Sequence, residues 1–134
     1  MSNRWRWLDF ILAGYWTLIF VGTHLPMAPS QHFNLSPIPL DKIAHFSAFG
    51  LLGLLLIASI RDIRRPIQVL LFLTAVIAAY GVLDELTQKL VPSRSADFWD
   101  WVADMLGGCT GLLVGLAIRL NAPRARIPER PHST

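Results

Sequence analysis

The sequence predicts an all-α protein, a four-helix transmembrane bundle, and three observations support this fold class. Hydrophobic residues make up 53% of the chain and charged residues only 16%, whereas soluble domains average about 45–50% and about 25%. The apolar residues gather into four blocks of about 17 to 25 residues, which is the length of a membrane-spanning helix. Short polar or proline-containing joints separate the blocks, so we expect each block to be one helix.

The first predicted span covers residues 7–25, beside Trp5 and Trp7, which are typical of a membrane interface. A basic start followed by an apolar run also occurs in secretory signals, but signal cores are shorter and end at a small-residue cleavage site. Pro29 would follow any cut after Ala28. We therefore interpret this block as an uncleaved membrane anchor.

The remaining predicted spans cover residues 43–60, 67–90 and 98–120. Pro37 and Pro39 interrupt the joint before the second span, so this joint is not expected to be helical throughout. At ~1.5 Å per residue the third span would be about 36 Å long, which exceeds the ~30 Å hydrocarbon core. Its polar end is therefore expected near one membrane interface.

The basic residues predict the orientation of the bundle. Nine of the twelve fall on one side of the membrane if the chain crosses four times: Arg4, Arg6, Arg61, Arg64, Arg65, Arg119, Arg124, Arg126 and Arg130. Basic loops stay in the cytoplasm, so both termini are predicted to be cytoplasmic. We expect a single domain over residues 1–120 and a disordered cytoplasmic tail over 121–134. No basic helix accompanies the net charge of +3, so nucleic acid is not an expected partner.

The acidic residues gather at the opposite, outer end. Six of the nine lie there, on spans two to four: Asp41, Asp84, Glu85, Asp97, Asp100 and Asp104. Other polar residues accompany them: Lys42, His45, Gln88, Lys89 and Arg94. An acidic side chain at mid-membrane costs about 2.5 to 3.5 kcal/mol, so several of them facing lipid would threaten insertion.

Helical spacing predicts where these groups point. Asp41 and His45 are four residues apart, so both lie on one face of the second span. Spans three and four show the same kind of polar stripe, and we expect the stripes to face one another across a water-accessible pocket. His24, at the outer end of the first span, is close enough to join this pocket, but we interpret it as an interfacial residue.

Small residues predict how the helices behind the pocket pack. Gly107, Gly111 and Gly115 repeat every four residues on the fourth span, a spacing that lets membrane helices approach backbone to backbone. Cys109 lies among them and is expected to pack there, and a lone cysteine excludes an internal disulfide.

Two segments resemble the VanZ-like family of small bacterial membrane proteins over Asp41 to Gly115: DKIAHFSAFGLLGLLL and GVLDELTQKLVPSRSADFWDWVADMLGGCTGLLVG. The resemblance implies a multi-pass protein of the bacterial inner membrane and these signature positions: Lys42, His45, Asp84, Glu85, Gln88, Arg94, Asp97, Asp100 and Gly107. Asp104 departs from the asparagine that many relatives carry late in the last element. The family's namesake is linked with low-level resistance to the glycopeptide teicoplanin.

The first functional hypothesis is recognition of an envelope component by the outward-facing charged pocket. The expected partners are membrane lipids and a lipid-linked wall precursor or an amphiphilic glycopeptide, since cationic side chains can meet phosphate and carboxylates can accept hydrogen bonds from sugars or amines. The candidate binding residues are Lys42, His45, Asp84, Glu85, Gln88, Arg94, Asp97, Asp100 and Asp104.

Three other interpretations stay open from the sequence. The pocket can be a hydrolase site with acid–base groups or a divalent metal, a proton-coupled transport path, or an ion-pair network that only sets helix register. We expect no metal and no cofactor, because the chain has no H-E-x-x-H motif, no cysteine pair and no G-x-S-x-G element. The sequence assigns neither a catalytic residue nor an oligomeric state.

Overall fold

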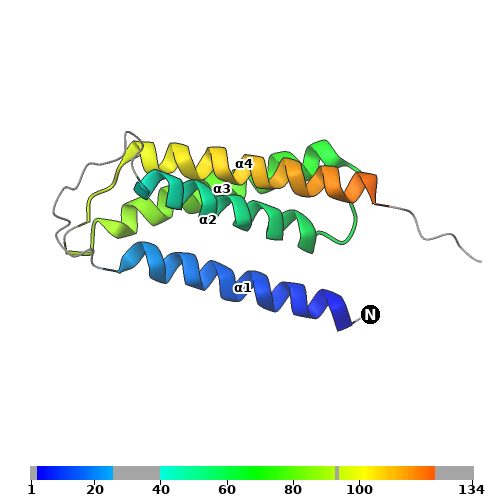
Figure 1. The fold of residues 1–134 in the computed structure, drawn as a ribbon, viewed down its shortest axis with the longest axis horizontal. Helices are drawn as coiled ribbons and strands as arrows, with labels where there is room; N and C mark the ends of the chain where they lie inside the picture. The colour runs from blue at the N-terminus through cyan, green and yellow to red at the C-terminus, as the bar shows by residue number, and fades with distance from the viewer. Residues whose placement is uncertain (1–2, 26–39, 93, 123–134) are drawn as a thin grey trace, which may run out of the picture.

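The computed structural model describes residues 3–25, 40–92 and 94–122, and these residues form four α-helices and no strand. The helices are α1 (Asn3–His24), α2 (Leu40–Ser59), α3 (Pro66–Gln88) and α4 (Phe98–Asn121). They run side by side along the long axis of the molecule (Figure 1). The prediction of an all-α, four-helix fold is therefore confirmed.

Three of the helices are long and apolar enough to cross a membrane: α2, α3 and α4. α1 contains 22 residues, which corresponds to about 33 Å. Its own crossing of the membrane stays a prediction, as do the division into domain and tail and the cytoplasmic placement of both termini. Asn121 ends α4, and residues 123–134 of the predicted tail lie outside the described residues.

The closest pair of helices is α2 and α4, which contact each other along most of their length. Glycines make this approach possible. A Cβ atom added at Gly107 would clash with the backbone carbonyl of Phe46, and one added at Gly111 would clash with the carbonyl of Gly50. At Gly115 an added Cβ would meet the side chain of Ile57. Backbone of α4 thus lies against backbone of α2, as in other small-residue membrane interfaces.

The third helix, α3, packs against α4 and completes the apolar core. Ile77 of α3 is fully buried, and its side chain fills the space that a Cβ at Gly108 would need. The core continues along the bundle through fully or nearly fully buried side chains of three helices: Phe49, Leu52, Ile57, Leu73, Ile77 and Leu112. Burial of these side chains accounts for the packing of α2, α3 and α4 into one unit.

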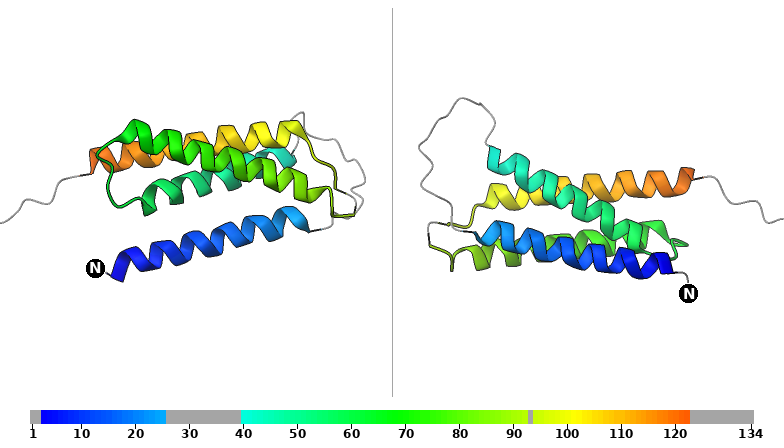
Figure 2. Two further views of the ribbon diagram at one scale, coloured as in Figure 1. Left: turned by 180° about the vertical axis from the view of Figure 1, so that it is seen from behind. Right: turned by 60° about the horizontal axis from the view of Figure 1, so that its bottom comes forward.

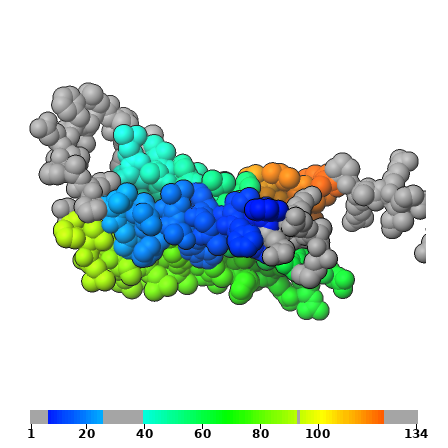
Figure 3. Space-filling model, turned by 90° about the horizontal axis from the view of Figure 1, so that it is seen from below, coloured from blue at the N-terminus to red at the C-terminus, as the bar shows by residue number. Residues whose placement is uncertain are grey.

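The first helix, α1, lies over the seam between α2 and α3 (Figures 2 and 3). It contacts both of these helices but not α4 within the described residues. The Tyr15 hydroxyl donates a hydrogen bond to the Ala48 carbonyl of α2 at 2.9 Å, and Trp16 packs edge-to-face on Tyr80 of α3 at 5.1 Å. Aromatic side chains therefore anchor α1 at mid-length.

The four helices place two chemically different ends on the bundle. α1 and α3 end where α2 and α4 begin, and most of the acidic residues lie at this end (Figure 1). The opposite end carries basic residues of the α2–α3 joint and of the last turn of α4, among them Arg61, Arg64 and Arg119. There Arg61 pairs with Asp9 of α1 at 3.6 Å.

Arg119 holds α4 to the end of α2, and its replacement should destabilise the bundle. Its Nη1 atom donates hydrogen bonds to the Ile57 carbonyl at 2.7 Å and to the Ile60 carbonyl. Ile57 belongs to the last turn of α2, where no intrahelical donor serves its carbonyl, and Ile60 directly follows the helix. Because a hydrogen bond from a charged group contributes about 1.5–3 kcal/mol, Arg119→Met is expected to lower the free energy of unfolding by about 2 kcal/mol.

Unfolding titrated with denaturing detergent measures this change. Arg64→Met is the matched control, because the Arg64 side chain is exposed and pairs with Asp62 at the surface. The control should change the free energy by less than about 0.5 kcal/mol. Equal effects of the two substitutions would contradict the role of Arg119.

Candidate functional site

Five polar side chains are buried at the acidic end of the bundle: His45 of α2, Asp84, Glu85 and Gln88 of α3, and Asp104 of α4. We call these five residues the polar cluster. Asp104 is completely buried, and Asp84 is 1% exposed. At ~1.5 Å per residue, His45 lies about 7.5 Å from the start of α2 and Asp104 about 9 Å from the start of α4. His45 and Asp104 therefore lie one to two helical turns inside the bundle.

His45 and Asp104 form the centre of the polar cluster and join α2 to α4. The Nδ1 atom of His45 lies 2.9 Å from Asp104 Oδ1, and its Nε2 atom lies 4.0 Å from Asp100 Oδ2. An ionised carboxylate only accepts hydrogen bonds, so Nδ1 carries the proton of this bond. The bond fixes the orientation of the imidazole ring and leaves Nε2 without a hydrogen bond among the described residues.

Lys42 forms the rim of the site. Its Nζ atom lies 2.6 Å from both Asp97 Oδ2 and Asp100 Oδ1, so one ammonium bridges two carboxylates of the start of α4. The hydrogen bond from Lys42 holds the pKa of the Asp97 carboxyl below its usual range, and the hydrogen bond from the Trp99 amide adds to this effect. Lys42 thus offsets part of the negative charge of the rim and is held there by Asp97 and Asp100.

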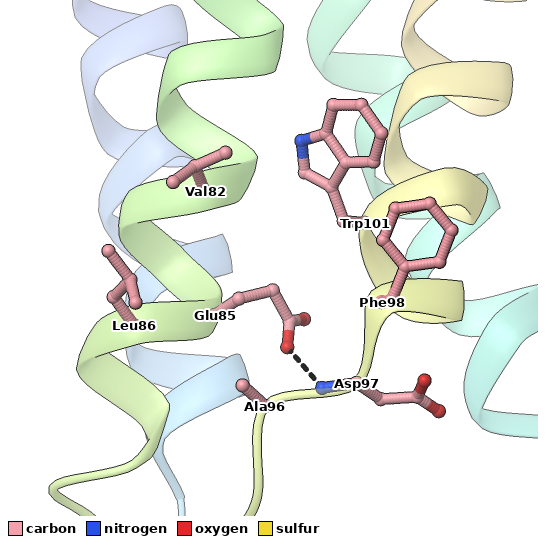
Figure 4. A pocket seen from close by; sticks show the side chains of 7 residues that line it. All are labelled: Val82, Glu85, Leu86, Ala96, Asp97, Phe98 and Trp101. Carbon is pink, nitrogen blue, oxygen red and sulfur yellow. Dashed lines mark hydrogen bonds between the residues drawn. The ribbon is translucent and has the colours of Figure 1, made fainter.

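Glu85 reaches from α3 toward the start of α4. Its Oε2 atom accepts a hydrogen bond from the Asp97 amide at 2.7 Å (Figure 4). Its Oε1 atom is buried and has no hydrogen-bond partner among the described residues. The same holds for Asp104 Oδ2. Two buried carboxylates therefore each present one oxygen without a donor, an arrangement that costs free energy unless another group binds there.

Asp84 faces the other side of α3, toward α1. Its Oδ1 atom accepts a hydrogen bond from the Thr23 hydroxyl at 2.8 Å, and its Oδ2 atom accepts one from Gln88 Nε2 at 2.7 Å. His24 Nδ1 lies 3.8 Å from Asp84 Oδ1, and His24 Nε2 lies 2.8 Å from the Thr87 hydroxyl. Both carboxylate oxygens of Asp84 are thus occupied by protein groups.

Sequence reasoning missed the contribution of α1. The expected pocket lay between spans two, three and four, whereas Thr23 and His24 of α1 contact α3 beside the polar cluster. A threonine and a histidine at the end of an apolar block match an ordinary interfacial pattern, so nothing in their spacing separates the two cases. The Tyr80 hydroxyl was missed as well; it is buried and has no partner within the described part of the chain.

Arg94 was expected to bind a carboxylate or a phosphate, and in the structure its guanidinium binds a backbone carbonyl at the end of α1, that of Leu25. Its Nε and Nη2 atoms donate to the Leu25 carbonyl at 3.3 and 3.2 Å, and so they tie the α3–α4 joint to the end of α1. Asp41 also stays at the edge, where its side chain is exposed and lies 3.7 Å from Lys42 Nζ. Of the nine candidate binding residues, Asp84 and Gln88 form a separate pair, and six are linked into one network: Lys42, His45, Glu85, Asp97, Asp100 and Asp104.

Two hollows approach the polar cluster from opposite sides. A groove of about 310 Å³ lies between α3 and the start of α4 (Figure 4), lined by Val82, Glu85, Leu86, Ala96, Asp97, Phe98 and Trp101. A second hollow of about 330 Å³ lies between α1 and α2 and includes His45, Thr23 and Arg94. Glu85 thus lines the first hollow and His45 the second. We call the first hollow the α3–α4 groove.

The chemistry of the cluster is that of a site for a cation or for hydrogen-bond donors. One donor atom each of His45, Glu85 and Asp104 lie within 4.8 Å of one another, and all three residues are buried. Carboxylate oxygens and an imidazole nitrogen are ligands of divalent metals and acceptors for amines and hydroxyls. A ligand rich in negative charge would be repelled by the carboxylates of Glu85 and Asp104.

One curated relative has been identified, a Schizosaccharomyces pombe protein named Uncharacterized protein C11E3.10. It is 30% identical to the chain over 109 residues, and the match covers 79% of this chain. The same match covers 62% of the yeast protein, so the chain spans less than two thirds of the length of that relative. No solved structure matches the chain.

The family assignment comes from the sequence profile of VanZ/LLP1, which matches residues 5–119. The match includes all four helices except the ends of α1 and α4, together with every residue of the polar cluster. It extends the resemblance described above, which covers only Asp41 to Gly115, to most of α1. The chain therefore belongs to the VanZ/LLP1 family.

Proposed function

We propose that the chain binds an amphiphilic molecule of the cell envelope at the membrane surface. In this proposal the polar part of the ligand contacts the polar cluster, and its apolar part lies in the α3–α4 groove. The supporting observation is Glu85, which lines the groove and has one buried oxygen, Oε1, without a partner among the described residues. A lipid, a lipid-linked wall precursor and an amphiphilic glycopeptide share the required chemistry.

The walls of the α3–α4 groove suit an apolar chain. Val82 and Leu86 line it from α3, and Phe98 and Trp101 line it from the first turn of α4 (Figure 4). Val82, Leu86 and Phe98 are exposed, so in a membrane they meet lipid without crossing a protein barrier. A groove open to lipid admits an acyl or prenyl chain laterally, because the chain leaves one apolar environment for another.

The charges select the polar part of the ligand. Lys42 is bound to Asp97 and Asp100 at the rim. The polar cluster itself contains three carboxyl groups, those of Asp84, Glu85 and Asp104, and one ionisable base, His45. Hydroxyl or amino groups can donate to the free oxygens of Glu85 and Asp104. A polar part with such donors is therefore preferred to a bare anion.

The proposed orientation places this site on the outer face of the membrane. The basic residues of the α2–α3 joint and of the last turn of α4 lie at the end opposite the polar cluster, and basic segments remain cytoplasmic. An outward-facing site suits a role in the cell envelope, including protection from a glycopeptide. Because a relative occurs in a yeast, the similarity does not by itself assign the chain to a bacterial inner membrane.

The binding role predicts that filling the groove abolishes ligand binding. Val82→Trp places a large ring in the α3–α4 groove, whereas Leu83→Trp places the same ring on an exposed position that does not line it. Each protein is reconstituted in phosphatidylcholine nanodiscs and tested with phosphatidylethanolamine, undecaprenyl phosphate and teicoplanin as probes. We expect at least one probe to bind the parent, to bind Leu83→Trp equally well, and to bind Val82→Trp at least about tenfold more weakly, a loss of about 1.4 kcal/mol.

Failure of all three probes to bind the parent would contradict the proposal. Equal binding by Val82→Trp and the parent would contradict the placement of the apolar part in the groove. Unfolding midpoints of both variants within about 2 °C of the parent show that the fold is intact; this margin corresponds to less than about 0.5 kcal/mol.

A hydrolytic function is the second candidate, and the His45–Asp104 pair is the observation that favours it. An imidazole held by a carboxylate through Nδ1 keeps its Nε2 atom available for proton transfer. Mass spectrometry of the bound probe in the same experiment separates the two functions. Recovery of the intact probe supports recognition, and time-dependent loss of a phosphate or a sugar supports hydrolysis.

A further inference from the structure

Three side chains from three different helices bring metal-ligating atoms together inside the bundle. His45 of α2, Glu85 of α3 and Asp104 of α4 each contribute one atom to a group whose members lie within 4.8 Å of one another. Their side chains are 7%, 6% and 0% exposed, respectively. Exposed acidic groups often lie near one another without a bound cation. Burial of two carboxylates beside an imidazole, in contrast, has a large cost in free energy unless their charge is offset.

The free atoms of these side chains point to a missing partner. Glu85 Oε1 and Asp104 Oδ2 are buried and have no hydrogen-bond partner in the described residues. The other oxygen of each carboxylate is occupied: Glu85 Oε2 accepts from the Asp97 amide, and Asp104 Oδ1 binds His45 Nδ1. Both carboxylates are therefore oriented by one oxygen and offer the second, which is the usual arrangement of a metal ligand held by outer hydrogen bonds.

We propose that His45, Glu85 and Asp104 form a binding site for a divalent transition-metal cation of the Zn²⁺ and Mn²⁺ class. One imidazole nitrogen with two carboxylate oxygens suits these cations, whereas Mg²⁺ and Ca²⁺ prefer oxygen ligands alone. The site has three protein ligands, so a further coordination position is left for water or for a ligand. Binding of the cation at this site does not require the amphiphile proposed above.

The geometry needs only a small contraction to hold the cation. Two atoms bonded to the same Zn²⁺ at about 2.0–2.2 Å lie no more than about 4.4 Å apart. One ligand atom of each side chain already lies within 4.8 Å of the other two, so a contraction of less than about half an ångström brings them to this value. Hollows reach two of the three ligands, since Glu85 lines the α3–α4 groove and His45 lines the hollow between α1 and α2.

The charges around the site favour the binding of a cation. The buried carboxylates near His45 come from α3 and α4, and the ammonium of Lys42 is held 2.6 Å from both Asp97 and Asp100 at the rim. Arg94 is bound to the Leu25 carbonyl. Within the described residues neither Glu85 nor Asp104 pairs with a lysine or an arginine, so a divalent cation would supply positive charge beside the imidazole of His45.

The test is a Zn²⁺ titration of the full chain in phosphatidylcholine nanodiscs after treatment with a chelator. The readouts are the metal content per chain, the dissociation constant from competition with a fluorescent Zn²⁺ indicator, and the thermal midpoint. We expect one Zn²⁺ per chain, a higher midpoint with Zn²⁺ than with chelator, and no displacement by equal concentrations of Mg²⁺ or Ca²⁺.

Glu85→Gln is the decisive variant, because glutamine has the same shape and can still accept the hydrogen bond from the Asp97 amide. It should weaken Zn²⁺ binding at least about tenfold, since even a change in an outer partner of a metal ligand has this effect. Asp62→Asn is the control; it removes an exposed carboxylate at the opposite end of the bundle and should leave binding unchanged.

Three results would overturn the site, and the first does not depend on any variant folding. They are a parent chain that binds no Zn²⁺, a Glu85→Gln variant that binds as tightly as the parent, and displacement of Zn²⁺ by Mg²⁺. None of these measurements uses an amphiphile, so failure of the metal site leaves the binding role untouched, and the reverse also holds.

Discussion

Replacing Gly111 with alanine is expected to lower the free energy of unfolding by about 3 kcal/mol and to separate α2 from α4. A Cβ atom at this position would clash with the Gly50 carbonyl and would lie 2.9 Å from the Leu54 amide nitrogen. Overpacking in a core costs about 1–3 kcal/mol when side chains can adjust. Backbone atoms cannot rotate out of the way, so the effect should lie at the upper end of this range.

Gly14→Ala is the matched control for this substitution. It adds the same methyl group to a helix, but a Cβ at Gly14 of α1 has no neighbour within 4 Å. Alanine also has the higher helix propensity, by about 1 kcal/mol, so the control should be neutral or slightly stabilising. The measurement is unfolding in denaturing detergent. If Gly111→Ala is as stable as Gly14→Ala, the close contact between α2 and α4 is wrong.

The fold could be predicted from sequence because a membrane restricts the choices. Apolar blocks of spanning length must be helices, since the bilayer offers backbone groups no other partner. Proline marks one helix bound in the sequence, because α3 begins at Pro66. The start of α4 is capped by Asp97, which accepts a hydrogen bond from the Trp99 amide, and this cap was not predicted from the sequence. What composition does not specify is which helices touch, and here the structure adds that α1 packs on α2 and α3.

The candidate site was harder to predict than the fold. Spacing four residues apart indicates that Asp84 and Gln88 share one face of α3, and in the structure they do form a hydrogen bond. Periodicity does not give the rotation of that face relative to its neighbours. Asp84 turns toward Thr23 of α1, while Glu85, the next residue, turns toward α4. One residue of a helix is about 100° of rotation, so adjacent acids serve different partners.

The expectation that the chain holds no metal came from linear motifs, and the proposed cation site shows their limit. Motifs such as H-E-x-x-H detect ligands that lie on one helix. His45, Glu85 and Asp104 lie on three helices and have no fixed spacing in the sequence. Only the packing of α2, α3 and α4 brings them within reach of one another, and no linear pattern encodes that arrangement.

Replacing His45 with leucine is expected to lower the free energy of unfolding by about 3–5 kcal/mol, a larger effect than that of Gly111→Ala. Leucine has a similar volume but cannot donate a hydrogen bond to Asp104 Oδ1, which lies 2.9 Å from His45 Nδ1. Asp104 is completely buried, and its Oδ2 atom has no partner within the described residues. Removing one member of a buried pair leaves an uncompensated charge, and this accounts for the size of the effect.

A double substitution tests whether the cost comes from the stranded carboxylate or from lost packing. His45→Leu with Asp104→Leu removes both polar partners, and apolar replacement of a whole buried pair is often neutral. We expect the double variant to be at least about 2 kcal/mol more stable than the sum of the two single changes predicts. Chelator-treated protein is used so that metal binding does not enter the comparison. If the changes in the free energy of unfolding are strictly additive, His45 and Asp104 act independently. Only in a coupled pair does the second substitution restore part of the stability that the first removes.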